Sequence, residues 1–150
     1  MRIAVGSDHA GYDAKQEVLQ MLREHGHEVR DMGAYSHDCV DYPDIAVAVS
    51  ERVARGEADR GILVCGTGIG MSITANKVRG VRAALCHDEF TARAARKHND
   101  ANVLAVGART TAVYAILRIV DIFLEVQFAG GRHSARVQKI AECERKYGGC

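Results

Sequence analysis

Short apolar runs alternate with longer segments of helical periodicity from one end of this sequence to the other. We expect a strand at each apolar run, and the runs are Ile3–Gly6, Glu28–Met32, Gly61–Cys65, Arg82–Cys86 and Val103–Gly107. The stretch Ile62–Cys65 has no polar alternation, which is typical of a strand buried on both faces. The pattern therefore predicts an α/β fold with a parallel sheet between layers of helices.

Helical patterns fill the segments between these strands, at Tyr12–Glu24, Asp44–Arg55, Gly70–Lys77 and Glu89–Lys97. Pro43 suits the first turn of the second helix. A last helix is expected at Ser134–Lys146. The elements together predict a Rossmann-like three-layer α/β/α sandwich with a five-stranded parallel sheet, plus a C-terminal helix. Because no linker interrupts the pattern, we expect residues 1–150 to form a single domain.

The segment Thr111–Phe128 is apolar almost all round, and its polar stripe is reduced to Arg118, Asp121 and Glu125. A helix of this composition must be covered on more than one side. Two interpretations follow, since the helix could pack on the sheet and under the C-terminal tail, or it could form a subunit interface.

Composition excludes several classes of function. The formal net charge is +1, so no overall field attracts nucleic acid or an anionic membrane. No apolar run approaches the roughly 20 residues of a membrane span, and Met1–Gly6 is too short for a signal peptide. The five cysteines form an odd set without a C-x-x-C pair. We therefore expect a cytoplasmic protein with free thiols and no disulfide framework.

A glycine-rich turn, Cys65–Gly70, follows the third strand and leads into a helix. Its glycines allow a ligand to approach the backbone N–H groups, which form an anion site at a helix N-terminus. Glycines at such turns are also common for purely structural reasons. Cys65 adds specificity, because a thiolate is stabilised beside a helix N-terminus.

A dinucleotide site is the competing interpretation of this turn. Asp88 lies 20 residues after Gly68, as the acidic residue of such sites does. However, the glycine spacing is G-x-G-x-G rather than G-x-G-x-x-G, and the chain is too short to add a separate substrate domain. This interpretation is therefore disfavoured.

The first strand leads into Asp8 and His9. In a sheet of flavodoxin-like order the first and third strands are neighbours, which would bring these two side chains beside Cys65. Asp8 has a purely structural alternative as the N-cap of the following helix. His9 has no comparable structural role.

Basic residues gather at three further places. The cluster Arg96–Asp100 lies at the opposite edge of the predicted sheet from Cys65, so His98 is either part of a plain helix C-terminus or serves the site of a second subunit. Arg132 and Arg136 are one helical turn apart, which suits either a bound phosphate or a solvated face. Arg109, after the fifth strand, raises the same question.

Six motifs together resemble the type B ribose-5-phosphate isomerases over residues 2–145, and they are Ser7–Gly11, Asp41–Pro43, Cys65–Ser72, Ala75–Lys77, His98–Asn102 and Gly130–His133. The resemblance implies interconversion of ribose 5-phosphate and ribulose 5-phosphate without metal or cofactor. It also implies a homodimer with sites at the subunit interface, so that His98 acts across it. Pairing of dimers into tetramers stays open.

The same resemblance implies roles for individual residues in catalysis. Cys65 is similar to the base that moves a proton between C2 and C1, and Thr67 to the group that helps proton movement between the oxygens. His98 is similar to the residue that opens the furanose ring, with Asp8 as a helper. Backbone N–H groups would stabilise the enediolate, and they belong to Gly66, Gly68, Ile69 and Gly70.

The resemblance also implies contacts that hold the substrate. The phosphate-contacting positions are His9, Arg109, Arg132 and Arg136, and the contacts to sugar hydroxyls are Tyr42 and Asn99. His133 is either a contact or only shapes its turn. In one branch of the family serine replaces the cysteine and a glutamate four residues on is the base; Cys65 and Ile69 place this chain in the cysteine branch. There are two alternatives: an isomerase of a six-carbon sugar phosphate such as allose 6-phosphate, and a phosphosugar-binding module without turnover.

Overall fold

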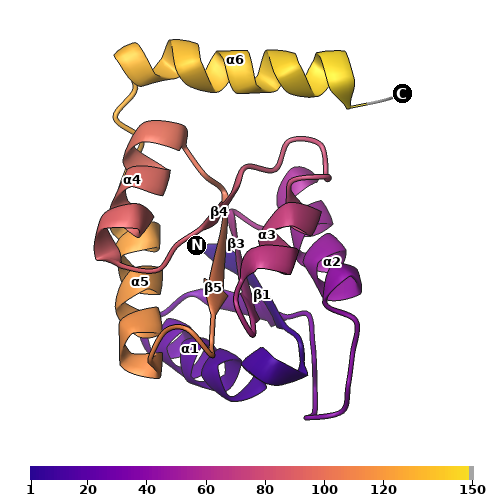
Figure 1. The fold of residues 1–150 in the computed structure, drawn as a ribbon. Coiled ribbons are helices and arrows are strands. Elements are labelled where there is room, and N and C mark those ends of the chain that lie inside the picture. Colours follow the sequence, from indigo (N-terminus) through magenta and orange to yellow (C-terminus); the bar gives the residue numbers. More distant parts are fainter. Residues whose placement is uncertain (149–150) are drawn as a thin grey trace.

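The computed structural model describes residues 1–148 and contains one sheet of five parallel strands (Figure 1). The strands are β1 (Arg2–Ser7), β2 (Glu28–Asp31), β3 (Arg60–Cys65), β4 (Ala83–Leu85) and β5 (Val103–Gly107). Their order across the sheet is β2-β1-β3-β5-β4, and every neighbouring pair is parallel. The predicted α/β class and the five-stranded parallel sheet are confirmed.

The strand order agrees with the flavodoxin-like expectation at the centre of the sheet and departs from it at one edge. β1 and β3 are neighbours, as expected. β5, however, pairs with β3 and separates it from β4. The burial of the strands accounts for this order, because all five residues of β5 are buried whereas the three of β4 are only half-buried. The sequence analysis counts Glu28–Met32 among the apolar runs, but β2 is a half-exposed edge strand.

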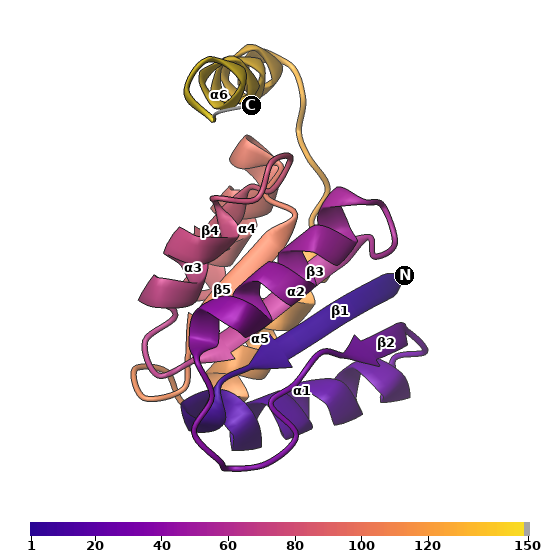
Figure 2. The same cartoon turned by 90° about the vertical axis from the view of Figure 1, so that its right-hand side faces the viewer.

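Helices cover both faces of the sheet, and their bounds are α1 (Tyr12–Glu24), α2 (Tyr42–Ala54), α3 (Ile69–Ala75), α4 (Glu89–Asn99), α5 (Val113–Glu125) and α6 (Arg132–Tyr147). α1, α4 and α5 lie on one face and α2 and α3 on the other (Figures 1 and 2). Alternate residues of β3 enter the two cores, since Ile62 and Val64 pack with the first group of helices and Leu63 and Cys65 with the second. The three-layer sandwich is thus confirmed.

The apolar helix α5 packs on the sheet between α1 and α4, with Ile116, Ile119 and Phe123 fully buried. The C-terminal helix α6 does not cover it as one interpretation had proposed. α6 instead packs near the end of α4 and lies across that end of the molecule (Figure 1). Its only buried residue is His133, so most of its surface is exposed.

Four cysteines lie within the described residues and all are free thiols, as expected: Cys39, Cys65, Cys86 and Cys143. Cys150 lies outside those residues. Burial raises the pKa of Cys86 to about 11, so this thiol stays protonated and fills the core at the end of β4. Within residues 1–148, the helices are too short or too polar for a membrane crossing.

Lys15 is a fully buried lysine in α1. Its Nζ donates to both carboxylate oxygens of Asp31, at 2.7 and 2.9 Å, and to the carbonyl oxygen of Ala34, at 2.5 Å. The rings of Tyr12 and Tyr35 lie 5.5 and 5.6 Å from the same nitrogen. These contacts tie α1 to the loop between β2 and α2, which leads to Tyr42.

We expect Lys15→Met to lower the free energy of unfolding by about 3–5 kcal/mol, because it leaves the carboxylate of Asp31 without its buried partner. Urea denaturation of the two proteins measures the difference. Arg55→Met is the matched control, since the exposed pair of Arg55 with Glu51 should contribute no more than about 0.5 kcal/mol. A loss at Lys15 as small as at Arg55 would contradict the prediction.

Candidate active site

The turn after β3 brings a thiol and a backbone amide together. Cys65 is the last residue of β3, and its Sγ accepts a hydrogen bond from the N–H of Gly68 at 3.0 Å. The side chain is only 5% exposed. The structure thus aims an N–H donor at the sulfur, at the start of α3.

Gly68 is required by this geometry. Its φ of +79° lies in the left-handed region, which side chains rarely adopt. A Cβ on Gly68 would also collide with Leu85 and with the backbone of Val106 in β5. The turn is therefore folded tightly against the neighbouring strand, and this packing fixes the position of the amide beside Cys65.

Side chains from other parts of the chain pack directly on the other two glycines of the turn, Gly66 and Gly70. The chain of Arg109 lies over Gly66, with Cδ 3.4 Å from the place of a Cβ, and the N–H of Arg109 donates to the carbonyl of Gly66 at 2.9 Å. The ring of Tyr42 lies directly on Gly70 in the same way. Arg109 and Tyr42 are thus brought to the turn from the ends of β5 and α2.

Thr67 is exposed at the tip of the turn, and its Oγ1 accepts the N–H of Ile69 at 3.3 Å. The side chain of Ile69 is 52% exposed and faces away from the core. Ile69 therefore brings a backbone N–H to the turn and no charged group of its own, which agrees with the assignment of Cys65, rather than a carboxylate, as the candidate base.

The end of β1 lies beside this turn, because Ser7 pairs with Val64 and the N–H of Asp8 donates to the carbonyl of Val64 at 3.2 Å. Oδ1 of Asp8 accepts the N–H of Gly11 at 2.9 Å, so Asp8 caps the short helical turn before α1. Asp8 therefore has a capping role, but at the short turn His9–Gly11 and not at α1, whose N-cap is Gly11. Nδ1 of His9 is buried, and no residue within 1–148 forms a hydrogen bond with it.

A first group of predicted residues therefore lies at the carboxyl edge of the sheet: Asp8, His9, Tyr42, Cys65, Gly66, Thr67, Gly68, Ile69, Gly70 and Arg109. This edge also faces away from α6 (Figure 1). Ligands bind at this edge in open α/β sheets. The group contains a thiol, a hydroxyl, amides and an arginine, which suit proton transfer next to a negatively charged oxygen.

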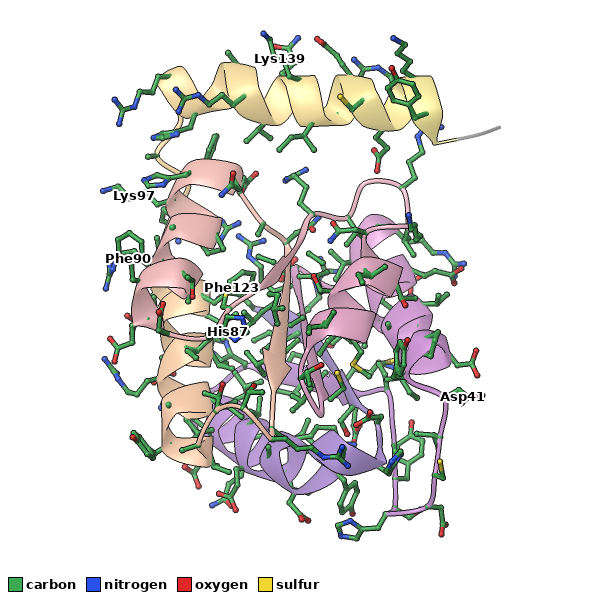
Figure 3. All side chains as sticks on the ribbon, viewed as in Figure 1. Asp41, His87, Phe90, Lys97, Phe123 and Lys139 are labelled. Atoms are coloured by element: carbon green, nitrogen blue, oxygen red, sulfur yellow. The ribbon has the colours of Figure 1, made fainter. Side chains whose placement is uncertain are left out.

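A second group lies at the opposite edge. α4 runs back from the carboxyl edge and ends at Asn99, while α6 begins at Arg132. The rings of His98 and His133 stack at a centroid distance of 4.4 Å with 15° between their planes. In Figure 3 the neighbouring Lys97 lies beside the start of α6, and Asp41, next to Tyr42, lies at the far lower right. Within one chain the structure separates His98, Asn99, Arg132, His133 and Arg136 from Cys65.

His133 is the most buried member of this second group, at 9% exposed. Burial lowers its pKa, and the cationic side chains of Arg132, Arg136 and Lys97 nearby lower it further. The imidazole of His133 is therefore neutral at pH 7. Arg132 and Arg136 are exposed on the first turns of α6, so their guanidinium groups are available to an anion.

The sequence does not predict the burial of two charged residues, Lys15 and Arg96. The sequence analysis does not single out Lys15, and it groups Arg96 with the cluster at a helix C-terminus, yet Lys15 is fully buried and Arg96 is only 2% exposed. The signal for Arg96 was available, because Ala92, Ala95 and Arg96 share the buried face of α4. An arginine on such a face indicates a buried partner.

Comparison with known proteins places the chain in a family. The profile of the family described as Ribose/Galactose Isomerase matches residues 3–140. The chain is 46% identical to Ribose-5-phosphate isomerase B of Escherichia coli over 97% of both proteins. It is 43% identical to the galactose-6-phosphate isomerase subunit LacB of Clostridium acetobutylicum, over 93% of this chain and 80% of that protein.

A solved structure shares both sequence and fold with this chain. The structure of Ribose-5-Phosphate Isomerase B from Clostridium thermocellum is 52% identical, covers 98% of this chain and 99% of its own, and superposes with a TM-score of 0.97. Agreement in sequence and fold over nearly the whole length extends the resemblance seen in the six motifs. The chain belongs to the ribose/galactose isomerase family, and it is an aldose–ketose isomerase.

Proposed function

We propose that this chain interconverts ribose 5-phosphate and ribulose 5-phosphate by proton transfer through an enediolate, with Cys65 as the base. The observation that carries the proposal is the contact between Sγ of Cys65 and the N–H of Gly68, which places the sulfur beside the backbone amides of the same turn. The similarity to the Escherichia coli enzyme supports ribose 5-phosphate as the substrate.

The residues of the carboxyl edge suit the steps of this reaction. Cys65 removes the proton from C2, and the amides of Gly66–Gly70 stabilise the oxygen that becomes negative. Thr67, fixed by its contact with Ile69, moves the proton between the two oxygens. Arg109 and His9 hold the phosphate, and Tyr42 contacts a hydroxyl of the sugar. The buried Nδ1 of His9, which has no hydrogen-bond partner within residues 1–148, supports the role of His9 in binding the phosphate.

A homodimer completes the proposed site. Ring opening by His98, aided by Asp8, and the contacts of Asn99, Arg132 and Arg136 require residues that one chain keeps at the other edge of the sheet. A groove of about 850 Å³ between α6 and the β4 edge supports a partner on this side, since Ile140 and Tyr147 are exposed beside it. In this proposal, the chain is a single cytoplasmic domain that forms the dimer.

A six-carbon sugar phosphate is the second candidate substrate, and the similarity to the galactose-6-phosphate isomerase subunit favours it. We expect ribose 5-phosphate to exceed allose 6-phosphate and galactose 6-phosphate in kcat/KM by about tenfold or more, because a pocket sized for one sugar discriminates by roughly 1–3 kcal/mol for each added carbon. Steady-state assays of the three sugars measure this ratio.

Isomerisation in deuterated water is the accompanying assay. A base that exchanges its proton with solvent places deuterium at C1 or C2 of the sugar, whereas a phosphosugar-binding module places none. Higher kcat/KM with a six-carbon sugar would transfer the proposal to that substrate, and the absence of both turnover and deuterium incorporation with all three sugars would exclude their isomerisation.

A further inference from the structure

Arg96 joins the turn that ends α4 to the end of α5 at the amino edge of the sheet. Its Nη1 donates to Oδ1 of Asp100 at 2.8 Å and to the carbonyl of Ala101 at 2.6 Å. Its Nε donates to the carbonyl of Val126, just after α5, at 3.3 Å. The guanidinium also lies 5.8 Å from the ring centroid of Phe123, which is labelled on the ribbon in Figure 3.

Asp100 receives a second arginine on its other side. Arg82 donates from Nη2 to Oδ2 of Asp100 at 3.1 Å and to the Asp100 carbonyl at 2.8 Å, and from Nε to the carbonyl of Asn99 at 3.2 Å. Asp100 is the C-cap of α4 and has a φ of +46°, the only positive φ outside glycine among the described residues. The two arginines hold the chain in this turn directly after His98 and Asn99.

The segment that leads to α6 is fixed by the same contacts. Val126, which Arg96 binds, starts the linker between α5 and α6. The N–H of Ala129, further along this linker, donates to the carbonyl of Lys97 at 3.0 Å. The stacked rings of His98 and His133 form a further contact between the end of α4 and the start of α6. Arg96 thus supports both the α4 residues of the second group, His98 and Asn99, and the linker that leads to its α6 residues.

Stability alone does not account for a charge at this place. Replacing a buried ion pair by apolar side chains of similar size is often neutral or stabilising, so a fully buried arginine with directional partners indicates a need for geometry. Three acceptors from two segments, the turn Asp100–Ala101 and Val126 after α5, match the planar fork of a guanidinium, which a lysine ammonium does not reproduce.

We propose that Arg96 is a positioning residue that sets the geometry of the half-site bearing His98, Asn99, Arg132 and Arg136. The inference rests on the proposed function, in which this half-site acts on substrate held at Cys65 of a second copy. Arg96 reaches the reaction only through the residues that it orients. A variant at Arg96 therefore damages the half-site of its own chain at the amino edge and leaves its Cys65 edge intact.

Arg96→Lys and Arg96→Met test this inference, and Arg93→Met is the matched control on the exposed face of the same helix. We expect both Arg96 variants to lower kcat/KM for ribose 5-phosphate by about 10- to 100-fold, since small displacements of reacting groups have effects of that size. Arg93→Met should keep wild-type kinetics. Arg96→Lys preserves the charge and serves if Arg96→Met fails to fold.

Heterodimers separate positioning from a general loss of structure. An Arg96→Lys subunit paired with a Cys65→Ala subunit combines an intact Cys65 edge with an intact partner half-site, so one site per dimer should regain wild-type kcat and KM. The heterodimers are isolated by two different affinity tags after co-expression. Recovery to about half of the wild-type turnover per dimer supports the inference.

Two outcomes would overturn the inference while the proposed function stands. One is wild-type kinetics in both Arg96 homodimers. The other is failure of the Arg96→Lys and Cys65→Ala pair to recover while a parallel pair of His98→Ala and Cys65→Ala does recover. If the His98 pair also fails, the arrangement of the site across two chains is wrong, and the inference falls with it.

Discussion

Replacing Cys65 with alanine should lower the turnover of ribose 5-phosphate by about 10²–10⁴-fold, the contribution of a well-placed general base. The chain has no substitute at this place, because the residue four positions after Cys65, the first of α3, is Ile69 and not a carboxylate. Binding should change little, since the residues proposed to hold the phosphate and hydroxyls, such as Arg109 and Tyr42, keep their contacts with Gly66 and Gly70.

Steady-state kinetics and isothermal titration with ribose 5-phosphate measure the two effects separately. Cys86→Ala is the matched control, because Cys86 is equally buried at the end of a strand but its raised pKa keeps it protonated. That control should lose stability and retain kcat. A Cys65→Ala protein with turnover close to wild type would remove Cys65 from the role of base.

The sequence predicts the fold where local pattern determines it. Apolar strands such as β3 and β5 and the glycine-rich turn after β3 are local features, and the structure contains them close to the expected bounds. The exchange of β4 and β5 in the sheet was not predicted, because strand order depends on how the crossover helices pack. The position of α6 was missed for a similar reason, since its contacts involve distant residues such as Gly80, whose N–H donates to Glu144.

The candidate site likewise has features that local sequence predicts and features that depend on tertiary packing. The contact of Cys65 with Gly68 spans three residues and follows from a helix starting after the strand. Strand direction alone placed His98 at the opposite edge from Cys65. The packing of Arg109 on Gly66 and of Tyr42 on Gly70 depends on tertiary structure that no local pattern contains. Buried charges such as Arg96 were missed because charged residue types are usually found exposed.

Heterodimers of Cys65→Ala and His98→Ala subunits should regain activity that neither variant has alone. In a two-fold symmetric dimer each site would take Cys65 from one chain and His98 from the other. One site of the heterodimer then carries both intact groups, and its second site carries neither. Turnover per dimer should therefore reach about half of the wild-type value. Two affinity tags isolate the heterodimers, and assays with ribose 5-phosphate measure the recovery.

Because Cys65 and His98 lie at opposite edges of one chain, recovery of activity in the heterodimer distinguishes a shared site from a site within one chain. Cys65 ends β3 at the carboxyl edge, while His98 lies at the end of α4, stacked on His133 beside the start of α6. A site contained in one chain would need these edges to meet, and then every heterodimer site would carry one defect and stay inactive. The tagged His98→Ala and wild-type pair is the control for subunit exchange, because it too should retain one working site. Heterodimers that match this control support a site shared between two chains, and inactive ones exclude it.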